Sequence, residues 1–497
     1  MRLDRLLAAA GLQGGGEAEV TGFAIDHRKV APGTVFGAFQ GASVNGEDYI
    51  SDAVQAGAVA VVARPEARVE GAFHIRDANP RRAFALIAAG FFTPLPATVA
   101  AVTGTNGKTS TVEMTRQIWR MAGERAASIG TLGVTTPDES VSTGLTTPDI
   151  VTFLGNLSGL AREGVTHVAF EASSHGLTQY RNEGVRPIAA GFTNLSRDHL
   201  DYHADMEDYF HAKMRLFDEV MADDGTAVVW LGAEPDEWSR RAVQHAEKRG
   251  VKIVTVGEGG ATIRLAAREP TQLGQTLTVE HGGATRTIAL PLIGAYQAAN
   301  ALVAAGLALA TGTEAMQVWD GLGRLQPVRG RLERAAISQA GAPIYVDYAH
   351  TPDAIEAAIA ALRPHVRVRL ITVLGAGGDR DHGKRAPMGR AAAKGSSLVI
   401  VTDDNPRGED PASIRAQVLL GAGEDAREIG DRREAIAAAI AEAGDGDIVL
   451  IAGKGHEQGQ IVGPNKETGA EMRVLPFDDV TVARECAGGQ GFSGGAA

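Results

Sequence analysis

Short apolar segments alternate with stretches of helical length along most of this chain, and this alternation constrains the fold more than any other feature of the sequence. A segment that is apolar along its whole length is typical of a strand in a parallel sheet covered by helices on both faces. The pattern therefore predicts an α/β domain around a mainly parallel sheet. Its expected strands are residues 98–102, 167–170, 189–192, 227–230 and 251–256.

Two proline-containing interruptions divide the chain into three regions. The first is residues 93–96, where Pro94 and Pro96 prevent a helix or strand from continuing. The second is residues 323–330, which contain Pro327 and two glycines. These interruptions predict an N-terminal domain at 1–95, a central domain at 96–327, a C-terminal domain at 328–487 and a flexible tail at 488–497.

The two larger regions differ in their patterning. Residues 262–291 alternate apolar and polar side chains over short spans, which favours antiparallel strands attached to the central domain, and a helix is expected at 296–310. After the second interruption the alternation of strands and helices resumes, which indicates a Rossmann-like, doubly wound C-terminal domain. Its expected strands are residues 344–347, 370–374, 398–402 and 448–451.

Charge and cysteine content restrict the compartment and the partners. The 60 acidic and 48 basic side chains give a net charge of −12, which disfavours nucleic acid and anionic membranes as partners. The single cysteine, Cys486, cannot form an internal disulfide and fits a reducing compartment. Asp4 interrupts the N-terminal apolar run, which is too short for a signal peptide. The longest apolar stretch, residues 301–310, has about half the length that spans a bilayer, so we expect a cytoplasmic protein without membrane insertion.

The segment TGTNGKTS, residues 103–110, follows a predicted strand and opens a predicted helix. In that context backbone N–H groups bind phosphate, the lysine reaches the terminal phosphates and the next threonine ligates Mg²⁺. Val102 stands where the general pattern has its first glycine, so an ordinary glycine turn is the alternative interpretation. The candidate ATP-binding residues are Gly104, Thr105, Asn106, Gly107, Lys108, Thr109 and Ser110.

Further motifs follow this loop in order: EASSHG (171–176), NLSRDHLDYH (194–203), AK (212–213), DYAHTPD (347–353), DNPR (404–407) and GKGHE (453–457). Together with the shortened loop GTNGKT, they resemble the motifs of the Mur ligases, which share their fold and mechanism with the folylpolyglutamate synthetases. The resemblance implies a uridine-nucleotide domain, a central ATPase domain and a C-terminal domain for an incoming amino acid. It also implies that ATP and Mg²⁺ convert a carboxylate into an acyl phosphate, which an amine then attacks. The motifs are most similar to those of members that add meso-diaminopimelate to UDP-N-acetylmuramoyl-L-alanyl-D-glutamate.

Four side chains carry the catalytic roles that the resemblance implies: Lys108, Glu171, His199 and Lys213. Lys108 would reach the phosphates, and Thr109, Glu171 and His199 would ligate Mg²⁺. Lys213 would be carbamylated by CO₂ and would bind Mg²⁺ through the carbamate. A carboxylate that caps a nearby helix is the structural alternative at Glu171. Without the resemblance, a surface lysine is the preferred interpretation at Lys213.

The resemblance also assigns the substrate sites. Asn300, Arg331, Asp347 and His350 would join the loop around ATP, close to Gln297, which replaces a usual asparagine. The muramoyl-dipeptide would contact Thr146, Thr147, Ser173, Gln179 and Arg181, and its uridine would contact Ile25, His27, Ala42, Ser43 and Val44. His27 stands where a serine is frequent. Diaminopimelate would contact Arg380, Asp404, Asn405, Pro406, Arg407, Gly453 and Glu457.

Arg407 bears on the nearest alternatives. With Arg380 it could hold the distal carboxylate of diaminopimelate, which lysine lacks, so it disfavours the lysine-adding sister ligase. A solvated arginine after an Asn-Pro turn is the structural alternative. The N-terminal region of 95 residues disfavours a folylpolyglutamate synthetase. Candidate metal ligands and a separate amino-acid pocket disfavour a regulator that uses ATP as a switch. We expect a monomer whose partners are small-molecule substrates.

Overall fold

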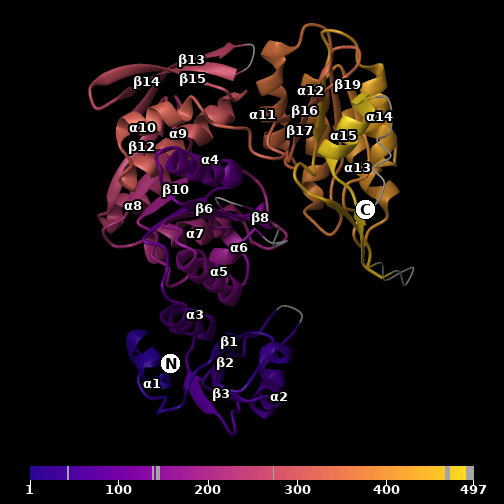
Figure 1. The fold of residues 1–497 in the computed structure, drawn as a ribbon. Helices are drawn as coiled ribbons and strands as arrows, with labels where there is room; N and C mark the ends of the chain where they lie inside the picture. Colours follow the sequence, from indigo (N-terminus) through magenta and orange to yellow (C-terminus); the bar gives the residue numbers. More distant parts are fainter. Residues whose placement is uncertain (42–43, 137–138, 142–145, 272–273, 465–470, 489–497) are drawn as a thin grey trace, which may run out of the picture.

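The chain folds into three α/β domains, and the central one lies between the other two (Figure 1). The computed structural model describes residues 1–41, 44–136, 139–141, 146–271, 274–464 and 471–488. The predicted uridine contacts Ala42 and Ser43, and the predicted tail from residue 489 onward, lie outside the described residues.

The N-terminal domain contains a parallel sheet in the order β1-β2-β3-β4. Its strands are β1 (Gly22–Ala24), β2 (Thr34–Gly37), β3 (Ala58–Ala63) and β4 (Phe73–Arg76), and its helices are α1 (Leu3–Ala9), α2 (Ile50–Gln55) and α3 (Pro80–Phe91). Asn79 caps α3 by accepting from the N–H of Arg82, and Pro80 occupies the first turn, where its missing N–H costs nothing. The apolar face of α3 packs against helix α5 (Ile150–Arg162) of the central domain. This shared core holds the two domains together.

Eleven strands of the described residues form the central sheet, in the order β15-β14-β13-β12-β11-β10-β5-β9-β6-β7-β8. The neighbours β6, β9, β5, β10, β11 and β12 are parallel. Residues 262–291 form the antiparallel strands β13, β14 and β15, as predicted. The bounds are β5 (Thr98–Thr103), β6 (Ala126–Gly130), β7 (Gly133–Thr135), β8 (Ser140–Val141), β9 (His167–Glu171), β10 (Ala189–Phe192), β11 (Thr226–Trp230), β12 (Lys252–Gly257), β13 (Ile263–Thr271), β14 (Gly274–His281) and β15 (Ala284–Leu290).

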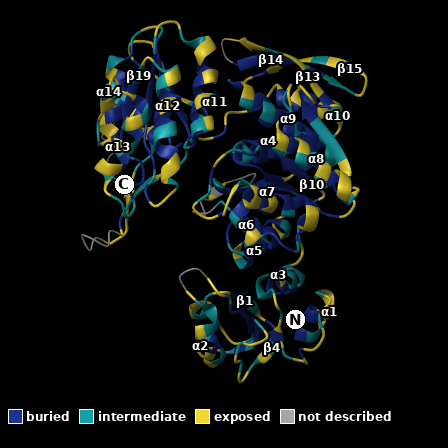
Figure 2. Ribbon diagram, turned by 180° about the vertical axis from the view of Figure 1, so that it is seen from behind, coloured by how far each residue is buried: buried dark blue, intermediate teal, exposed yellow. Residues whose placement is uncertain are grey.

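Helices cover both faces of the middle of this sheet, so the central strands β5, β6, β9, β10 and β11 are buried along most of their length (Figure 2). One core packs helices α4 (Lys108–Met121), α9 (Ala295–Ala310) and α10 (Ala315–Leu322) against one face. The other packs α5, α7 (Met206–Arg215) and α8 (Glu237–Arg249) against the opposite face. The short helix α6 (Ser174–Thr178) follows β9. The carboxyl ends of β5 and β9 lie side by side, which places the segments that follow them at one edge.

The C-terminal domain contains a second sheet in the order β16-β17-β21-β18-β19-β20, parallel apart from the edge strand β16. Helices on both faces make it doubly wound, as predicted. The strands are β16 (Glu333–Ile337), β17 (Pro343–Asp347), β18 (Leu370–Leu374), β19 (Leu398–Val401), β20 (Arg427–Glu428) and β21 (Ile448–Ala452), followed by the hairpin β22 (Gly459–Val462) and β23 (Arg473–Pro476). The helices are α11 (Pro352–Leu362), α12 (Arg385–Gly395), α13 (Pro411–Ala422), α14 (Arg432–Glu442) and α15 (Asp479–Gly488).

The predicted strands of both larger sheets are confirmed, with ends that differ by no more than one residue. No helix within the described residues is long and apolar enough to cross a membrane.

Candidate active site

The phosphate loop connects the carboxyl end of β5 to the N-terminus of α4, as the sequence predicts. Gly104 and Gly107 both have positive φ angles, of 145° and 88°. A Cβ atom at Gly104 would collide with Thr193, and one at Gly107 would collide with the Asn300 side chain. Both glycines are therefore required by the backbone conformation and by close packing.

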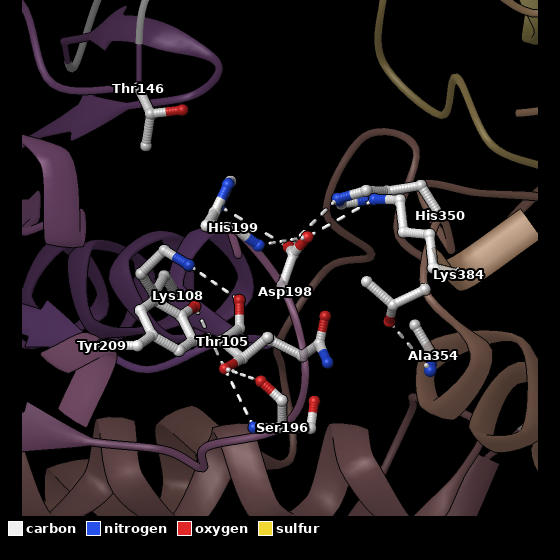
Figure 3. Close-up of polar contacts among 12 residues, drawn as sticks. Thr105, Lys108, Thr146, Ser196, Asp198, His199, Tyr209, His350, Ala354 and Lys384 are labelled. Carbon is white, nitrogen blue, oxygen red and sulfur yellow. Dashed lines mark hydrogen bonds and ion pairs between the residues drawn. The ribbon is translucent and has the colours of Figure 1, made fainter. Parts of the chain in front are cut away.

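Lys108 is the first residue of α4, and its side chain turns back over the loop. Its Nζ atom donates to the carbonyl oxygens of Gly104 and Thr105, each at 2.8 Å (Figure 3). Burial lowers the pKa of Lys108, whereas the carboxylates of Glu171 and Asp198 raise it. The ammonium group is thus folded back onto the main chain of the phosphate loop.

A cavity of about 380 Å³ opens over this loop, between the central and C-terminal domains. It brings together most of the predicted ATP and metal residues, and Gly104 is the one loop candidate outside its lining. Asn300, which lines it, comes from α9, and Arg331 donates from Nη2 to Thr109 Oγ1 at 3.0 Å. Predicted residues in the lining are Thr105, Asn106, Gly107, Lys108, Thr109, Ser110, Thr146, Glu171, Ser173, His199, Asn300, Arg331, Asp347 and His350.

Gln297 does not line this cavity. Its amide nitrogen donates to the carbonyl oxygen of Arg331 at 3.0 Å, and its side chain is buried. Gln297 therefore supports the main chain that carries Arg331, while Asn300 presents its amide to the cavity.

Glu171 ends β9, and a single residue fixes both of its carboxylate oxygens. Thr131 donates from its main-chain nitrogen to Oε1 at 2.7 Å and from its hydroxyl to Oε2 at 3.0 Å. A Cβ atom at Gly130 would collide with the same carboxylate. Because the partners lie in the loop after β6 and not at a helix N-terminus, the helix-cap interpretation of Glu171 is wrong.

Lys213 lies on the inward face of α7, with an exposed fraction of 1%. Its Nζ atom donates to the carbonyl oxygen of Gly104 at 2.8 Å and lies 4.3 Å from the ring centre of Tyr209. Burial, and then the charge of Lys108, hold the pKa of Lys213 well below its usual range. The surface-lysine interpretation is therefore wrong, since this is a buried amine behind the phosphate loop.

Asp198 and Lys384, which the sequence did not single out, meet where the central and C-terminal domains face each other (Figure 3). The buried Asp198 carboxylate lies 3.4 Å from Lys384 Nζ, 3.5 Å from His199 Nε2 and 3.7 Å from His350 Nε2. Burial raises the pKa of Asp198, yet the bond to His350 and the adjacent positive groups hold it well below normal. Asp198 precedes a predicted ligand, which was a usable signal, whereas no local pattern marked Lys384.

Tyr209 was also missed. Its hydroxyl lies 3.2 Å from Thr105 Oγ1, and Thr105 in turn donates to the carbonyl oxygen of Ser196 (Figure 3). One helical turn separates Tyr209 from Lys213 on α7, and that spacing was the signal in the sequence. Tyr209 thus ties the phosphate loop to the helix that carries Lys213.

The predicted dipeptide contacts form one hydrogen-bonded group beside Glu171. Arg181 donates to the carbonyl oxygen of Thr147 at 2.8 Å and to Gln179 Oε1 at 2.7 Å. The Thr147 hydroxyl lies 3.0 Å from both the carbonyl oxygen of Glu171 and the hydroxyl of Ser173. In the N-terminal domain, Ile25 and Val44 are exposed. There the His27 ring stacks on the Tyr49 ring with centres 4.3 Å apart.

A larger cavity, of about 1430 Å³, separates the central domain from the C-terminal domain and is lined by Arg380, Arg407 and Glu457. Arg407 is half-buried, with a φ angle of 50°, and donates from Nη1 to the carbonyl oxygen of Gly378 at 2.9 Å. Burial and then Arg380 lower its pKa. The structure therefore does not support a freely solvated Arg407.

Four of the predicted diaminopimelate contacts do not line this cavity: Asp404, Asn405, Pro406 and Gly453. Asn405 donates to Glu457 Oε2 at 2.8 Å and accepts from the buried Lys454 Nζ at 3.0 Å. Lys454 also donates to Glu457 Oε2 at 3.0 Å. Asn405 and Lys454 thus position Glu457. Lys454 was not predicted, although it lies inside a predicted motif.

The fold and this site define a three-domain α/β protein with a phosphate-binding loop at a domain interface. Three family models match the chain: "Mur ligase family, catalytic domain" at residues 19–91, "Mur ligase middle domain" at 102–308 and "Mur ligase, glutamate ligase domain" at 330–455. The chain belongs to the Mur ligase family and is a ligase.

Two curated relatives and one solved structure that resemble this chain carry the same name. A protein of Zymomonas mobilis named UDP-N-acetylmuramoyl-L-alanyl-D-glutamate–2,6-diaminopimelate ligase is 60% identical over 94% of each chain. A protein of the same name from Bradyrhizobium diazoefficiens is 51% identical over 93% of each chain. A solved structure of a ligase with this name is 33% identical, with a TM-score of 0.67 over 95% of each chain. Folylpolyglutamate synthase from Mycobacterium tuberculosis, 20% identical with a TM-score of 0.62 over 75% of this chain and 92% of its own, shares the fold.

Proposed function

We propose that this chain joins meso-diaminopimelate to the D-glutamyl carboxylate of UDP-N-acetylmuramoyl-L-alanyl-D-glutamate, with conversion of ATP to ADP and phosphate. The observation that carries the proposal is the adjacency of two cavities. One is lined by the phosphate loop, and the other by Arg380, Arg407 and Glu457. Relatives at 46–60% identity whose names specify this reaction support it.

The proposed reaction forms two bonds in sequence. First, the carboxylate oxygen bonds to the γ-phosphorus and the bond to the β,γ-bridging oxygen breaks, so that ADP leaves. The amine nitrogen then bonds to the acyl carbon, phosphate leaves with the electron pair, and the nitrogen loses a proton. Negative charge develops on phosphoryl oxygens in the first step, so Lys108 and the N–H groups at the start of α4 would stabilise it.

The residues around Glu171 fit Mg²⁺. Thr109 and Glu171 supply the hard oxygen donors that this ion prefers, and His199 faces the same cavity. Among the described residues, no group of three His, Cys, Asp or Glu side chains could hold a metal alone. That fits an ion held jointly by protein and nucleotide phosphates. When bound, Mg²⁺ would neutralise phosphate charge.

Thr131 is expected to set the affinity for Mg²⁺, because it orients both carboxylate oxygens of Glu171. In Thr131→Val, the side-chain bond is lost while the main-chain bond remains. Loss of such a supporting hydrogen bond typically weakens metal affinity about 10- to 100-fold. The concentration of Mg²⁺ that gives half-maximal turnover should therefore rise, and Thr131→Ser, which keeps a hydroxyl, should restore it. An unchanged Mg²⁺ dependence in Thr131→Val would contradict this role.

Lys213 is proposed to be carbamylated. The nitrogen of a neutral amine bonds to the carbon of CO₂ and loses a proton, so the reaction requires an unprotonated lysine. Burial and Lys108 lower the pKa of Lys213, which favours that form. The resulting carbamate would supply an additional anionic oxygen ligand for Mg²⁺.

Arg407→Ala is expected to impair use of diaminopimelate. Arg407 and Arg380 both line the large cavity, and a bidentate bond to the distal carboxylate would be lost. Loss of a charge-assisted bond costs about 1.5 to 3 kcal/mol, so kcat/KM for diaminopimelate should fall about 10- to 150-fold, with KM for ATP unchanged. Arg363→Ala, directly after the C-terminal end of α11 and in the lining of neither cavity, is the control. Unchanged kinetics for diaminopimelate would remove Arg407 from the site.

The deciding experiment measures phosphate release from ATP with Mg²⁺ and the nucleotide-dipeptide, adding meso-diaminopimelate, L-lysine or neither, with product masses. Stimulation by diaminopimelate and a tripeptide product would support the proposal. Stimulation by lysine alone would favour the lysine-adding reaction. Stimulation by neither would contradict both and favour the folate or regulatory alternatives.

We also propose that the protein acts as a monomer, since one chain supplies both the phosphate loop and the cavity around Arg407 that the reaction requires. We propose that it acts in the cytoplasm, because its single cysteine fits a reducing compartment. A dimer in light scattering at assay concentration would contradict the monomer.

A further inference from the structure

The nucleotide cavity and the large interdomain cavity share three lining residues, and each carries a hydroxyl group: Thr131, Thr146 and Tyr348. Thr131 and Thr146 belong to the central domain, where their hydroxyl oxygens lie 3.1 Å apart. Tyr348 comes from the C-terminal domain and follows β17 directly. These residues therefore mark the passage between the two cavities.

The ring of Tyr348 is held in place by its neighbours. The guanidinium carbon of Arg331 lies 4.3 Å from the ring centre, and the rings of His350 and His456 lie 4.6 and 5.0 Å from it. The main-chain oxygen of Tyr348 lies 2.8 Å from His350 Nδ1. Arg331 in turn reaches Thr109 of the phosphate loop. The ring is thus coupled to the nucleotide site by packing and one hydrogen bond.

The hydroxyl of Tyr348, in contrast, has no hydrogen-bond partner among the described residues. The side chain is half-buried and lines both cavities. Burial raises the pKa of Tyr348, and the carboxylates of Glu457 and Asp404 raise it further. The hydroxyl therefore keeps its proton at neutral pH. It can act as a hydrogen-bond donor and not as a base.

Few hydrogen-bond donors line both cavities and could therefore contact the phosphoryl group both on ATP and on the substrate carboxylate. Lys108 and Arg331 line the nucleotide cavity alone, and Arg407 lines the large cavity alone. Of the three residues that line both, Thr131 gives its single hydroxyl proton to Glu171. The Thr146 hydroxyl, 3.1 Å from that of Thr131, is then left to donate to Thr131. Among the three hydroxyl groups at the passage, that of Tyr348 is therefore the one whose proton is not used in a hydrogen bond within the described residues.

Resting on the ligase activity proposed above, we propose that the Tyr348 hydroxyl is a catalytic hydrogen-bond donor to the phosphoryl group that passes from ATP to the substrate carboxylate. In that step the carboxylate oxygen bonds to the γ-phosphorus, the bond to the bridging oxygen breaks, and ADP keeps the electron pair. Tyr348 neither gains nor loses a proton. Its hydrogen bond stabilises the charge on the transferring oxygens and orients the acyl phosphate toward the cavity that contains Arg407.

Positional isotope exchange tests this role before any amine is added. ATP labelled with ¹⁸O in the β,γ-bridge is incubated with Mg²⁺ and the nucleotide-dipeptide, and movement of label into the non-bridging β positions reports reversible acyl-phosphate formation. Tyr348→Phe keeps the ring and removes the hydroxyl. Its exchange should slow about 100-fold, as when one donor to a developing oxyanion is removed, with affinity for ADP unchanged.

Tyr345→Phe is the matched control, because Tyr345 lies on β17, packs in the C-terminal core and lines neither cavity. It should exchange like the wild type. Exchange at the wild-type rate in Tyr348→Phe would overturn the inference, and if only Tyr348→Ala is slow, the ring and not the hydroxyl is responsible. A wild type that makes no tripeptide would instead contradict the underlying ligase function.

Discussion

Lys108→Ala is expected to lower the rate of phosphoryl transfer about a thousandfold, which is the upper end of the loss for one preorganised donor at a charged transition state. The ammonium group lies within the phosphate loop and is held by two carbonyl oxygens, so phosphates that enter the cavity would meet a positioned cation. No other lysine lines the nucleotide cavity among the described residues. Phosphate release and isotope exchange should both fall.

The fold should survive this substitution, because the Gly104 carbonyl oxygen keeps Lys213 as a donor. Thermal unfolding would verify that point. Lys394→Ala, which removes an exposed lysine on α12, should turn over like the wild type. Normal turnover by Lys108→Ala would eliminate the phosphate-loop assignment.

Strand and loop positions were predictable because they depend on local order in the sequence. The phosphate loop needs a strand, two glycines, a lysine and a helix in succession, and all of these are adjacent along residues 98–121. The antiparallel segment at 262–291 was visible because its side chains alternate. Local patterns of this kind can be recognised without knowing which domains contact one another.

Contacts between distant segments were less predictable. Lys384 reaches Asp198 across 186 positions, and Tyr348 joins Thr131 at the passage only because two domains face each other. Lys213 shows the same limit, because the sequence of α7 does not reveal that this face turns behind the phosphate loop. Its burial depends on the phosphate loop, whose Gly104 carbonyl oxygen it reaches across 109 positions of the sequence.

Lys213→Ala is expected to lose most activity and to recover part of it with added formate or acetate. Removing a side chain with an exposed fraction of 1% leaves a buried space beside Gly104. A small carboxylate in that space would replace the anion that the carbamate supplies. Mutation of a residue that only supports a metal ligand typically lowers activity about 10- to 100-fold. For Lys213, a proposed ligand, we therefore expect activity to fall about 100-fold. Activity as a function of carboxylate concentration measures the rescue.

Lys213→Met distinguishes loss of the carbamate from loss of the buried side-chain volume. Methionine fills most of the same volume, so the variant should fold, but it cannot react with CO₂ and leaves no room for a small acid. It should be as inactive as Lys213→Ala and should not respond to acetate. Wild-type activity in either variant would contradict the proposal that Lys213 is carbamylated. Equal rescue of both would show that added carboxylate acts elsewhere on the protein.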